Sequence, residues 1–172
     1  MAGVSTESDE YERVAGAVLN QFRDELGLLS VGGKTKVQGV RSGTTWELDG
    51  SATTSTGKLI IEYRRYTKQK LKQEAVAAIV YRKDDCGAEA AILVSPLGLQ
   101  AGAKRVAQAE KIHEVTLNAD ASADKYVAFI YREDAIQGIV ADRMQMPTDE
   151  LISATMTHAD GTVEELDMGP KK

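Results

Sequence analysis

The chain has little of what marks secreted or membrane proteins. Cys86 is the only cysteine among 172 residues, so no internal disulfide can form. No apolar run approaches the ~18–20 residues that a transmembrane helix needs. The N-terminal segment MAGVSTESDE lacks the basic start and the apolar stretch of a secretory signal. We therefore expect a cytoplasmic protein in a reducing compartment, with no membrane partner.

Two common kinds of site are also poorly supported. His113 and His158 lie far apart in the sequence, which argues against a histidine metal site or a Cys86–His couple. The segment 98–102 is not a phosphate-binding loop, because the Lys-Ser/Thr ending is absent. Trp46, the only tryptophan, is most simply a core residue.

The overall charge hides a basic segment. The chain is 42% hydrophobic and 27% charged, which is typical of a soluble globular fold, and its formal net charge is −5. Residues 58–83 nevertheless hold eight Lys and Arg residues against two Glu residues, a net charge of +6. Such a cluster is usually a solvated surface, but it is also the footprint that phosphate binding requires.

Hydrophobic periodicity predicts alternating strands and helices. Residues 1–9 are expected to be disordered. We expect helices at Tyr11–Leu28, Leu71–Lys83 and Gln100–Lys111, and extended segments or strands at Lys36–Val40, Thr45–Asp49, Lys58–Tyr66, Ala90–Ser95 and His113–Leu117. From Lys58 onward the order strand, helix, strand, helix, strand predicts crossover units, so the sheet should have a parallel portion.

A polar linker at 118–125 separates this region from a tail rich in strands. Four further strands are expected, namely Tyr126–Tyr131, Ile136–Val140 and a hairpin of Ile152–His158 with Thr162–Leu166. The predicted domains are 10–118, an α/β domain with a mixed central sheet flanked by helices, and 119–172, a β-rich C-terminal extension. The tail would form either a small β module or extra strands of the main sheet.

The segment WELDGSATTSTGKLIIEYRRY carries the most specific chemistry. We read it as a strand ending at Asp49, a polar Gly/Ser/Thr turn, and a second strand containing Glu62 and Arg64. Residues two apart on a strand share a face, so Glu62 and Arg64 lie together while Tyr63 points to the other layer. If Thr45–Asp49 pairs antiparallel with Lys58–Tyr66, then Asp49 approaches Glu62.

Two converging carboxylates suit a hard divalent cation such as Mg²⁺ or Mn²⁺. The peptide carbonyl of Tyr63 would be a further ligand. A cation held there polarises a scissile phosphate and lowers the pKa of bound water. The simpler alternatives are a turn at Asp49-Gly50 and a surface ion pair between Glu62 and Arg64.

The chain resembles the PD-(D/E)XK nucleases, and within them the Mrr-like restriction endonuclease domain. The resemblance covers roughly residues 10–118 in order and spacing: the N-terminal helix, SGTTWELDG ending at Asp49, IIEYRRY, the basic helix KLKQEAVAAIV, the strand AAILVS, the helix GLQAGAKRVAQ and the strand IHEVTL. It implies a restriction-endonuclease-like fold and metal-dependent hydrolysis of DNA.

The resemblance also implies roles for individual residues. Asp49 and Glu62 would be the metal ligands, and Arg64 would occupy the position of the usual lysine. Gln73 would be a further catalytic residue with Asp49, Glu62 and Arg64, since it lies near a position where many such domains carry a glutamine, and Glu12 would be an outer carboxylate. The basic residues expected to attract the DNA backbone are Arg65, Lys68, Lys70 and Lys72.

Arg64 is the departure from the family pattern. A guanidinium stays protonated and cannot be a general base, although it binds phosphate bidentately. Either Arg64 acts electrostatically, or a lysine has migrated (Lys68, Lys70 or Lys72), or catalysis is lost and a nucleic-acid-binding or protein-binding fold remains. A third class is a structural subunit that assembles through its C-terminal hairpins. A homodimer would suit cleavage of both strands, and a separate targeting protein would suit so bare a domain.

Overall fold

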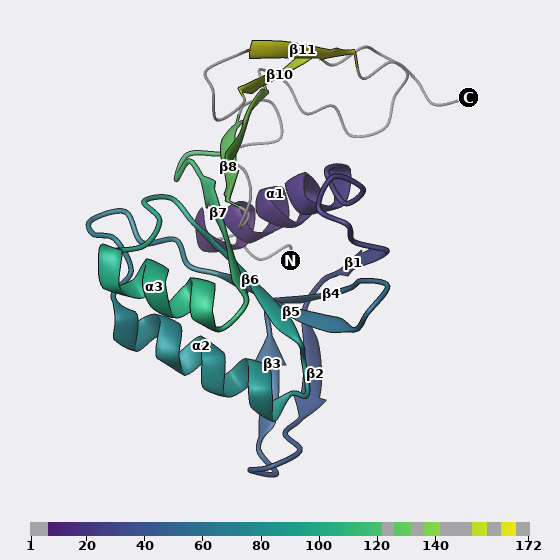
Figure 1. The fold of residues 1–172 in the computed structure, drawn as a ribbon, viewed down its shortest axis with the longest axis vertical. Coiled ribbons are helices and arrows are strands. Elements are labelled where there is room, and N and C mark those ends of the chain that lie inside the picture. The colour runs from purple at the N-terminus through teal and green to yellow at the C-terminus, as the bar shows by residue number, and fades with distance from the viewer. Residues whose placement is uncertain (1–6, 122–125, 132–135, 142–152, 158–162, 168–172) are drawn as a thin grey trace, which may run out of the picture.

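The chain builds a mixed sheet with helices on both faces. The computed structural model describes residues 7–121 and the strands at 126–131, 136–141, 153–157 and 163–167 (Figure 1). Its helices are α1 (Glu7–Gln21), α2 (Gln73–Asp85) and α3 (Ala101–Ala109), and its strands are β1 (Ser30–Gly32), β2 (Thr35–Gln38), β3 (Thr45–Leu48), β4 (Gly50–Thr53), β5 (Lys58–Tyr63), β6 (Ala90–Ser95), β7 (Ile112–Leu117), β8 (Tyr126–Tyr131), β9 (Ile136–Ala141), β10 (Ser153–Thr157) and β11 (Val163–Asp167).

Among these residues, nine strands form one sheet in the order β1-β4-β5-β6-β7-β8-β9-β10-β11, and β2 pairs with β3 separately. The strands β5, β6 and β7 are parallel, and the other pairs in the sheet are antiparallel. The helices α2 and α3 make the two crossovers between the parallel strands. The predicted mixed α/β fold with a parallel portion is therefore confirmed.

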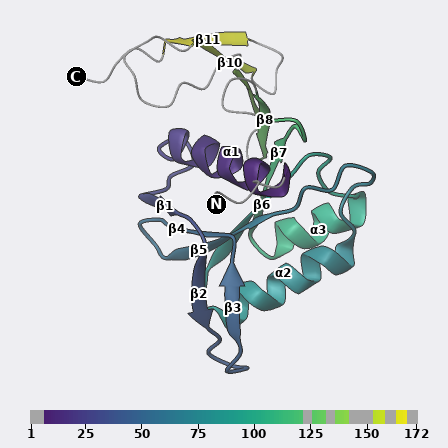
Figure 2. The ribbon, with the colours of Figure 1, turned by 180° about the vertical axis from the view of Figure 1, so that it is seen from behind.

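Two apolar cores hold the helices on the sheet. On one face α1 packs through Val14, Val18 and Leu19 against side chains such as Ile61 and Ile92. On the other face α2 and α3 pack over Ile60 and Leu93 (Figures 1 and 2). Because β5 and β6 are covered on both sides, their apolar residues are continuous and do not alternate with polar ones.

The N-terminal helix ends earlier than its apolar pattern predicted. It begins at Glu7 and ends at Gln21, so the prediction of helix as far as Leu28 was wrong, as was disorder at 7–9. Residues 22–27 form turns, and Gly27 adopts a positive φ of 67°. The apolar pattern continues past the helix because Phe22 and Leu28 pack into the same core from non-helical backbone. Residues 1–6 lie outside the described part.

The predicted polar turn before Lys58 was also partly wrong. Its first half forms β4, which pairs antiparallel with β5 and places Gly50 opposite Ile61, and only 54–57 form the turn. The strand Thr45–Leu48 pairs with β2 and not with β5, which corrects the expected hairpin. Glycine is required at position 50, because a Cβ there would lie 2.9 Å from the carbonyl oxygen of Gly32.

The strands after residue 121 continue the sheet. The strand β8 pairs antiparallel with β7, and β9, β10 and β11 follow in order. Of the two arrangements considered for the tail, this is the one in which extra strands extend the main sheet. The domain boundary at residue 118 stays a prediction.

The hairpin of β2 and β3 is fastened to the end of α2 by one buried carboxylate. Asp85 is fully buried and accepts hydrogen bonds from the backbone N–H groups of Arg41 (2.8 Å) and Ser42 (2.9 Å) and from the indole Nε1 of Trp46 (2.7 Å). The hydroxyl of Ser42 also donates to it. These donors hold the pKa of Asp85 well below its ordinary value. Asp85 thereby fixes Trp46 over α2.

Candidate active site

Asp49 and Glu62 converge on the guanidinium of Arg64. Asp49 directly precedes β4, and continuing the register of Gly50 with Ile61 places it opposite Glu62. Arg64 Nη2 lies 2.6 Å from Glu62 Oε2, and Arg64 Nη1 lies 3.6 Å from Asp49 Oδ2. The predicted convergence of the three residues therefore arises, although through β4 and not through the strand Thr45–Leu48.

Glu62 is buried and is held by two arginines. It has no exposed surface, and its second oxygen, Oε1, accepts a hydrogen bond from Arg82 Nη1. Burial raises the pKa of Glu62, and the charges of Arg64 and Arg82 oppose that rise. Removing a carboxylate from water is costly unless cations and hydrogen bonds compensate for the lost hydration. Glu62 thus has a charged partner on each oxygen.

Arg82 is the site residue that sequence reasoning missed. It comes from α2, and its guanidinium carbon lies 5.1 Å from the centroid of the Trp46 ring, in cation–π geometry. A signal did exist in the sequence. Arg82 falls on the apolar stripe of its helix, and a charged residue on an inward stripe needs a buried partner. The identity of that partner, Glu62, depended on the packing of α2 over β5.

Tyr63 contributes its backbone to the site and its ring to the core. Its N–H donates to Asp49 Oδ2 at 3.0 Å, and its carbonyl accepts from Arg64 Nη1 at 3.3 Å. The ring lies on the opposite face, where a Cβ on Gly16 of α1 would meet its hydroxyl at 3.3 Å. The carbonyl predicted as a further metal ligand is therefore at the site.

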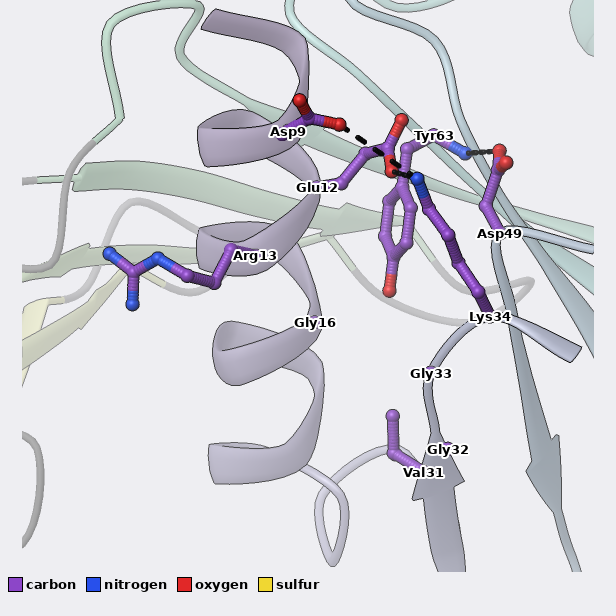
Figure 3. Close-up of a pocket in the computed structure, with 10 residues that line it drawn as sticks. All are labelled: Asp9, Glu12, Arg13, Gly16, Val31, Gly32, Gly33, Lys34, Asp49 and Tyr63. Atoms are coloured by element: carbon purple, nitrogen blue, oxygen red, sulfur yellow. Dashed lines mark hydrogen bonds and ion pairs between the residues drawn. The ribbon is translucent and has the colours of Figure 1, made fainter. Parts of the chain in front are cut away.

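Glu12 also approaches Asp49, from the side of α1. Glu12 and Asp49 line one cavity of about 360 Å³, together with Tyr63 and Lys34 (Figure 3). Lys34 Nζ lies 2.8 Å from Glu12 Oε2. The position of Glu12 fits the outer carboxylate that the resemblance implied, and its role stays a prediction.

Gln73 lies elsewhere. Gln73 is the exposed first residue of α2. Its side-chain oxygen lies against Gly102 of α3, where an added Cβ would be only 2.5 Å from that oxygen. The resemblance placed Gln73 among the catalytic residues, whereas the contacts described for it lead to α3. A catalytic role for Gln73 stays a prediction.

The four predicted backbone-binding residues divide into two groups. Lys68, Lys70 and Lys72 are exposed along the segment that joins β5 to α2. Arg65 is instead half-buried, where Nη2 lies 2.9 Å from Glu7 Oε2 and Nε donates to the carbonyl of Ala119 at 3.2 Å. The three lysines are free to meet a phosphate backbone, whereas Arg65 already links α1 to the end of β7.

A cation fits between the two carboxylates. Within the described ranges, no group of three or more His, Cys, Asp and Glu side chains is placed to hold a metal ion. The guanidinium of Arg64 nevertheless stands between Asp49 and Glu62 as a positive charge. Carboxylate and carbonyl oxygens are the ligands that hard divalent cations prefer. The donor set therefore fits such an ion once Arg64 turns away.

Separately, no helix in the described part is long and apolar enough to cross a bilayer.

Comparisons with known proteins bear on the family of the chain. A search among curated proteins finds no match. A solved structure titled "Crystal Structure of Protein of Unknown Function AF1548" matches with a TM-score of 0.51 at 17% identity, covering 60% of this chain and 56% of that one. The chain thus matches less than two thirds of that protein, and the likeness concerns the fold alone. A family model described as restriction endonuclease, Mrr_cat, matches residues 13–122, which is more than half of the chain and includes Asp49, Glu62 and Arg64. The chain therefore belongs to the Mrr-like restriction endonuclease family.

Proposed function

We propose that the chain is a metal-dependent endonuclease that hydrolyses phosphodiester bonds in DNA. The observation that carries the proposal is the convergence of Asp49 and Glu62 on one positive charge at the C-terminal end of β5. Membership of a nuclease family supports the reaction class. The ligands would be the two carboxylates and the carbonyl of Tyr63, with Mg²⁺ or Mn²⁺ as the ion.

A bound divalent ion would supply charge to the scissile phosphate and acidify the attacking water. The residues of the chain do the rest. Asp49 is oriented by the N–H of Tyr63, and Glu62 is oriented by Arg82. Both carboxylates are thus aimed before a ligand arrives, which limits the reorganisation needed in the reaction.

Arg64 would bind phosphate in place of the usual lysine. It is always protonated, so it stabilises negative charge and does not accept the proton of the attacking water. Its guanidinium already contacts both carboxylates, and it is partly exposed, with 30% of its side chain accessible. Turning from the carboxylates to a phosphate would keep two parallel N–H donors in use.

The DNA backbone would run along the segment between β5 and α2. Lys68, Lys70 and Lys72 supply exposed positive charge there, close in sequence to the end of β5. Arg65 would contribute to the field of this segment from its half-buried position. A homodimer, a separate targeting protein and a cytoplasmic location remain parts of the proposal.

A second candidate is a catalytically silent member of the fold that binds nucleic acid or a partner protein. It is favoured by the occupation of both Glu62 oxygens by arginines, Arg64 and Arg82. If neither guanidinium yields to a divalent ion, the site stays neutralised. The basic segment would then retain DNA without cleaving it.

Cleavage assays separate the two candidates. Purified protein is incubated with supercoiled and linear DNA in Mg²⁺, in Mn²⁺ and in chelator. The endonuclease proposal expects cleavage that chelator abolishes and that falls by about 100-fold or more in Asp49→Asn and Glu62→Gln. Glu47→Gln is the matched control, because Glu47 is a nearby carboxylate that is exposed and paired only with Lys36 in the described contacts. Salt-sensitive DNA binding without cleavage in either metal would instead establish the silent binder.

A further inference from the structure

One lysine reaches the candidate active site from a direction that the sequence did not suggest. Lys34 follows β1 and borders the cavity of about 360 Å³ that lies between α1 and Asp49. In Figure 3 its side chain runs along this cavity, with its ammonium between the carboxylates of Glu12 and Asp49. Lys34 thus approaches Asp49 in a cavity bordered by α1, whereas Arg82 reaches Glu62 from α2.

The contacts of Lys34 are acidic, and its own side chain is open to solvent. Its Nζ lies 2.8 Å from Glu12 Oε2 and 3.9 Å from Asp9 Oδ1. These carboxylates, with Asp49, raise the pKa of Lys34, so the side chain stays an ammonium near neutral pH. About two thirds of the side chain is accessible, at 66%, so a substrate can reach it.

The other candidates for the missing amine are placed less well. Arg64 is drawn to both carboxylates and neutralises a fully buried one. Lys68, Lys70 and Lys72 follow the end of β5, and the charge of Lys70 acts on Glu114, which lies two strands away from β5. Lys34, by contrast, lines the same cavity as Asp49.

We propose that Lys34 is the amine of this active site and donates a hydrogen bond to a non-bridging oxygen of the scissile phosphate beside Asp49. The proposal rests on the proposed function and deepens it. Lys34 exchanges Glu12 for the phosphate and keeps its proton. Water forms the new P–O bond, the P–O bond to the leaving sugar oxygen breaks, and the water proton passes through solvent to that oxygen. A point-charge ammonium suits this role, and the guanidinium of Arg64 would contact the same phosphate from the side of Glu62.

An ordinary ion pair is the competing explanation. Lys34 and Glu12 would then simply fasten the segment after β1 onto α1. Lys34 is 66% exposed and Glu12 19% exposed, so the pair would act on the fold and not on a substrate. Removing Lys34 would in that case leave both the rate of cleavage and the affinity for phosphate unchanged, so the two explanations predict different results.

The chain offers a matched control for the test. Lys36 lies two positions further on, in β2, and pairs with Glu47 at 2.8 Å on the exposed face of the hairpin. Lys36→Ala therefore removes the same charge from the same neighbourhood without touching the cavity. Lys34→Ala and the conservative Lys34→Arg complete the set, and thermal unfolding of each variant verifies the fold.

Two readouts on the full chain decide the proposal. The first is the single-turnover rate of cleavage of a linear DNA duplex at saturating protein in Mg²⁺. The second is the affinity for a 5′-phosphorylated oligonucleotide relative to its unphosphorylated form, measured by fluorescence anisotropy in Mg²⁺. We expect Lys34→Ala to lower the rate by about 100-fold and to abolish the preference for phosphate, Lys34→Arg to lose less than about tenfold, and Lys36→Ala to match the parent.

The outcomes separate the two proposals. If Lys34→Ala matches Lys36→Ala in both readouts, Lys34 is only an ion-pair residue, and the endonuclease proposal is untouched. If the parent protein does not cleave but prefers phosphate, and Lys34→Ala loses that preference, then Lys34 is a phosphate contact in a protein that is not a nuclease. If the parent neither cleaves nor prefers phosphate, the assignment of Lys34 is overturned.

Discussion

Glu62 and Asp85 are two fully buried carboxylates with opposite kinds of partner. Asp85 accepts from two backbone N–H groups, a hydroxyl and an indole, which are neutral donors fixed by the hairpin. Glu62 accepts from two guanidinium groups on long side chains that are partly exposed. Fixed neutral donors make a permanent tether, whereas mobile cations can be exchanged for another cation. The proposed function therefore assigns Asp85 to the fold and Glu62 to the chemistry.

The largest expected effect comes from the mobile partner Arg64. Arg64→Ala should lower the rate of cleavage by about 100-fold, because the phosphate loses a charged donor. Arg64→Lys should lose less than Arg64→Ala, since an ammonium restores the charge but not the two parallel N–H donors. Single-turnover kinetics in Mg²⁺ measures both. Equal rates for Arg64→Ala and the parent would mean that Arg64 only neutralises Glu62.

Replacing Asp85 should lower the stability of the fold and leave the candidate active site intact. In Asp85→Asn one acceptor oxygen becomes an amide donor that faces existing donors, so we expect Tm to fall by roughly 5 °C. Glu62→Gln should change Tm less, because Arg64 and Arg82 can turn toward water. Differential scanning calorimetry measures both shifts. A larger fall in Tm for Glu62→Gln than for Asp85→Asn would contradict the assignment of Asp85 to the fold and Glu62 to the site.

The two carboxylates should also respond oppositely to pH. The pKa of Asp85 is lowered from its ordinary 3.8, so its contribution to stability is present above about pH 4 and is lost as pH falls through the folded-state value. The pKa of Glu62 is raised from 4.5 by burial, so its charging costs stability as pH rises above that value.

Urea unfolding of the parent, Asp85→Asn and Glu62→Gln between pH 3 and pH 8 tests these signs. The advantage of the parent over Asp85→Asn should shrink below about pH 4, and its advantage over Glu62→Gln should grow as pH falls from 8 toward 4.5. A parent advantage over Glu62→Gln that grows with rising pH would show that the arginines outweigh burial.

Arg82 links the two carboxylates, because it contacts Glu62 and lies over Trp46, which is hydrogen-bonded to Asp85. Trp46 is the only tryptophan, so its fluorescence reports on this link. We expect Mg²⁺ to change the emission of the parent and to leave that of Arg82→Met unchanged. Arg41→Met is the control, because Arg41 lies over Tyr81 and not over Trp46. Equal responses in the parent and Arg82→Met would exclude the link.

The smallest expected effect concerns the three exposed lysines between β5 and α2, which contact neither Glu62 nor Asp85 in the described interactions. Each of Lys68→Glu, Lys70→Glu and Lys72→Glu should weaken DNA binding by only a few fold at moderate salt, because exposed phosphate contacts are screened. The slope of log affinity against log salt should become shallower in each. Anisotropy with a labelled duplex measures both quantities. An unchanged slope in all three variants would move the DNA path away from the segment between β5 and α2.

Much of the architecture was predictable from local pattern. Strands 90–95 and 126–131 were predicted with their observed bounds, because each is an apolar run between turn signals. The errors fell where local pattern and packing disagree. The apolar pattern runs past Gln21 because turns as well as helices can bury Phe22 and Leu28. The segment that forms β4 was predicted to be a turn because its residues are small and polar. It forms a strand instead, in which Gly50 and Ala52 are buried.

The sequence by itself determined the order of strands and helices and the presence of two acidic residues and an arginine at family-like spacing, because periodicity and spacing are properties of neighbouring residues. Only the tertiary structure decided which cations meet those acids. Arg82 reaches Glu62 from α2, and Lys34 reaches the cavity beside Asp49 from the end of β1. Such contacts join segments far apart in the chain, and their geometry follows from how the helices pack on the sheet.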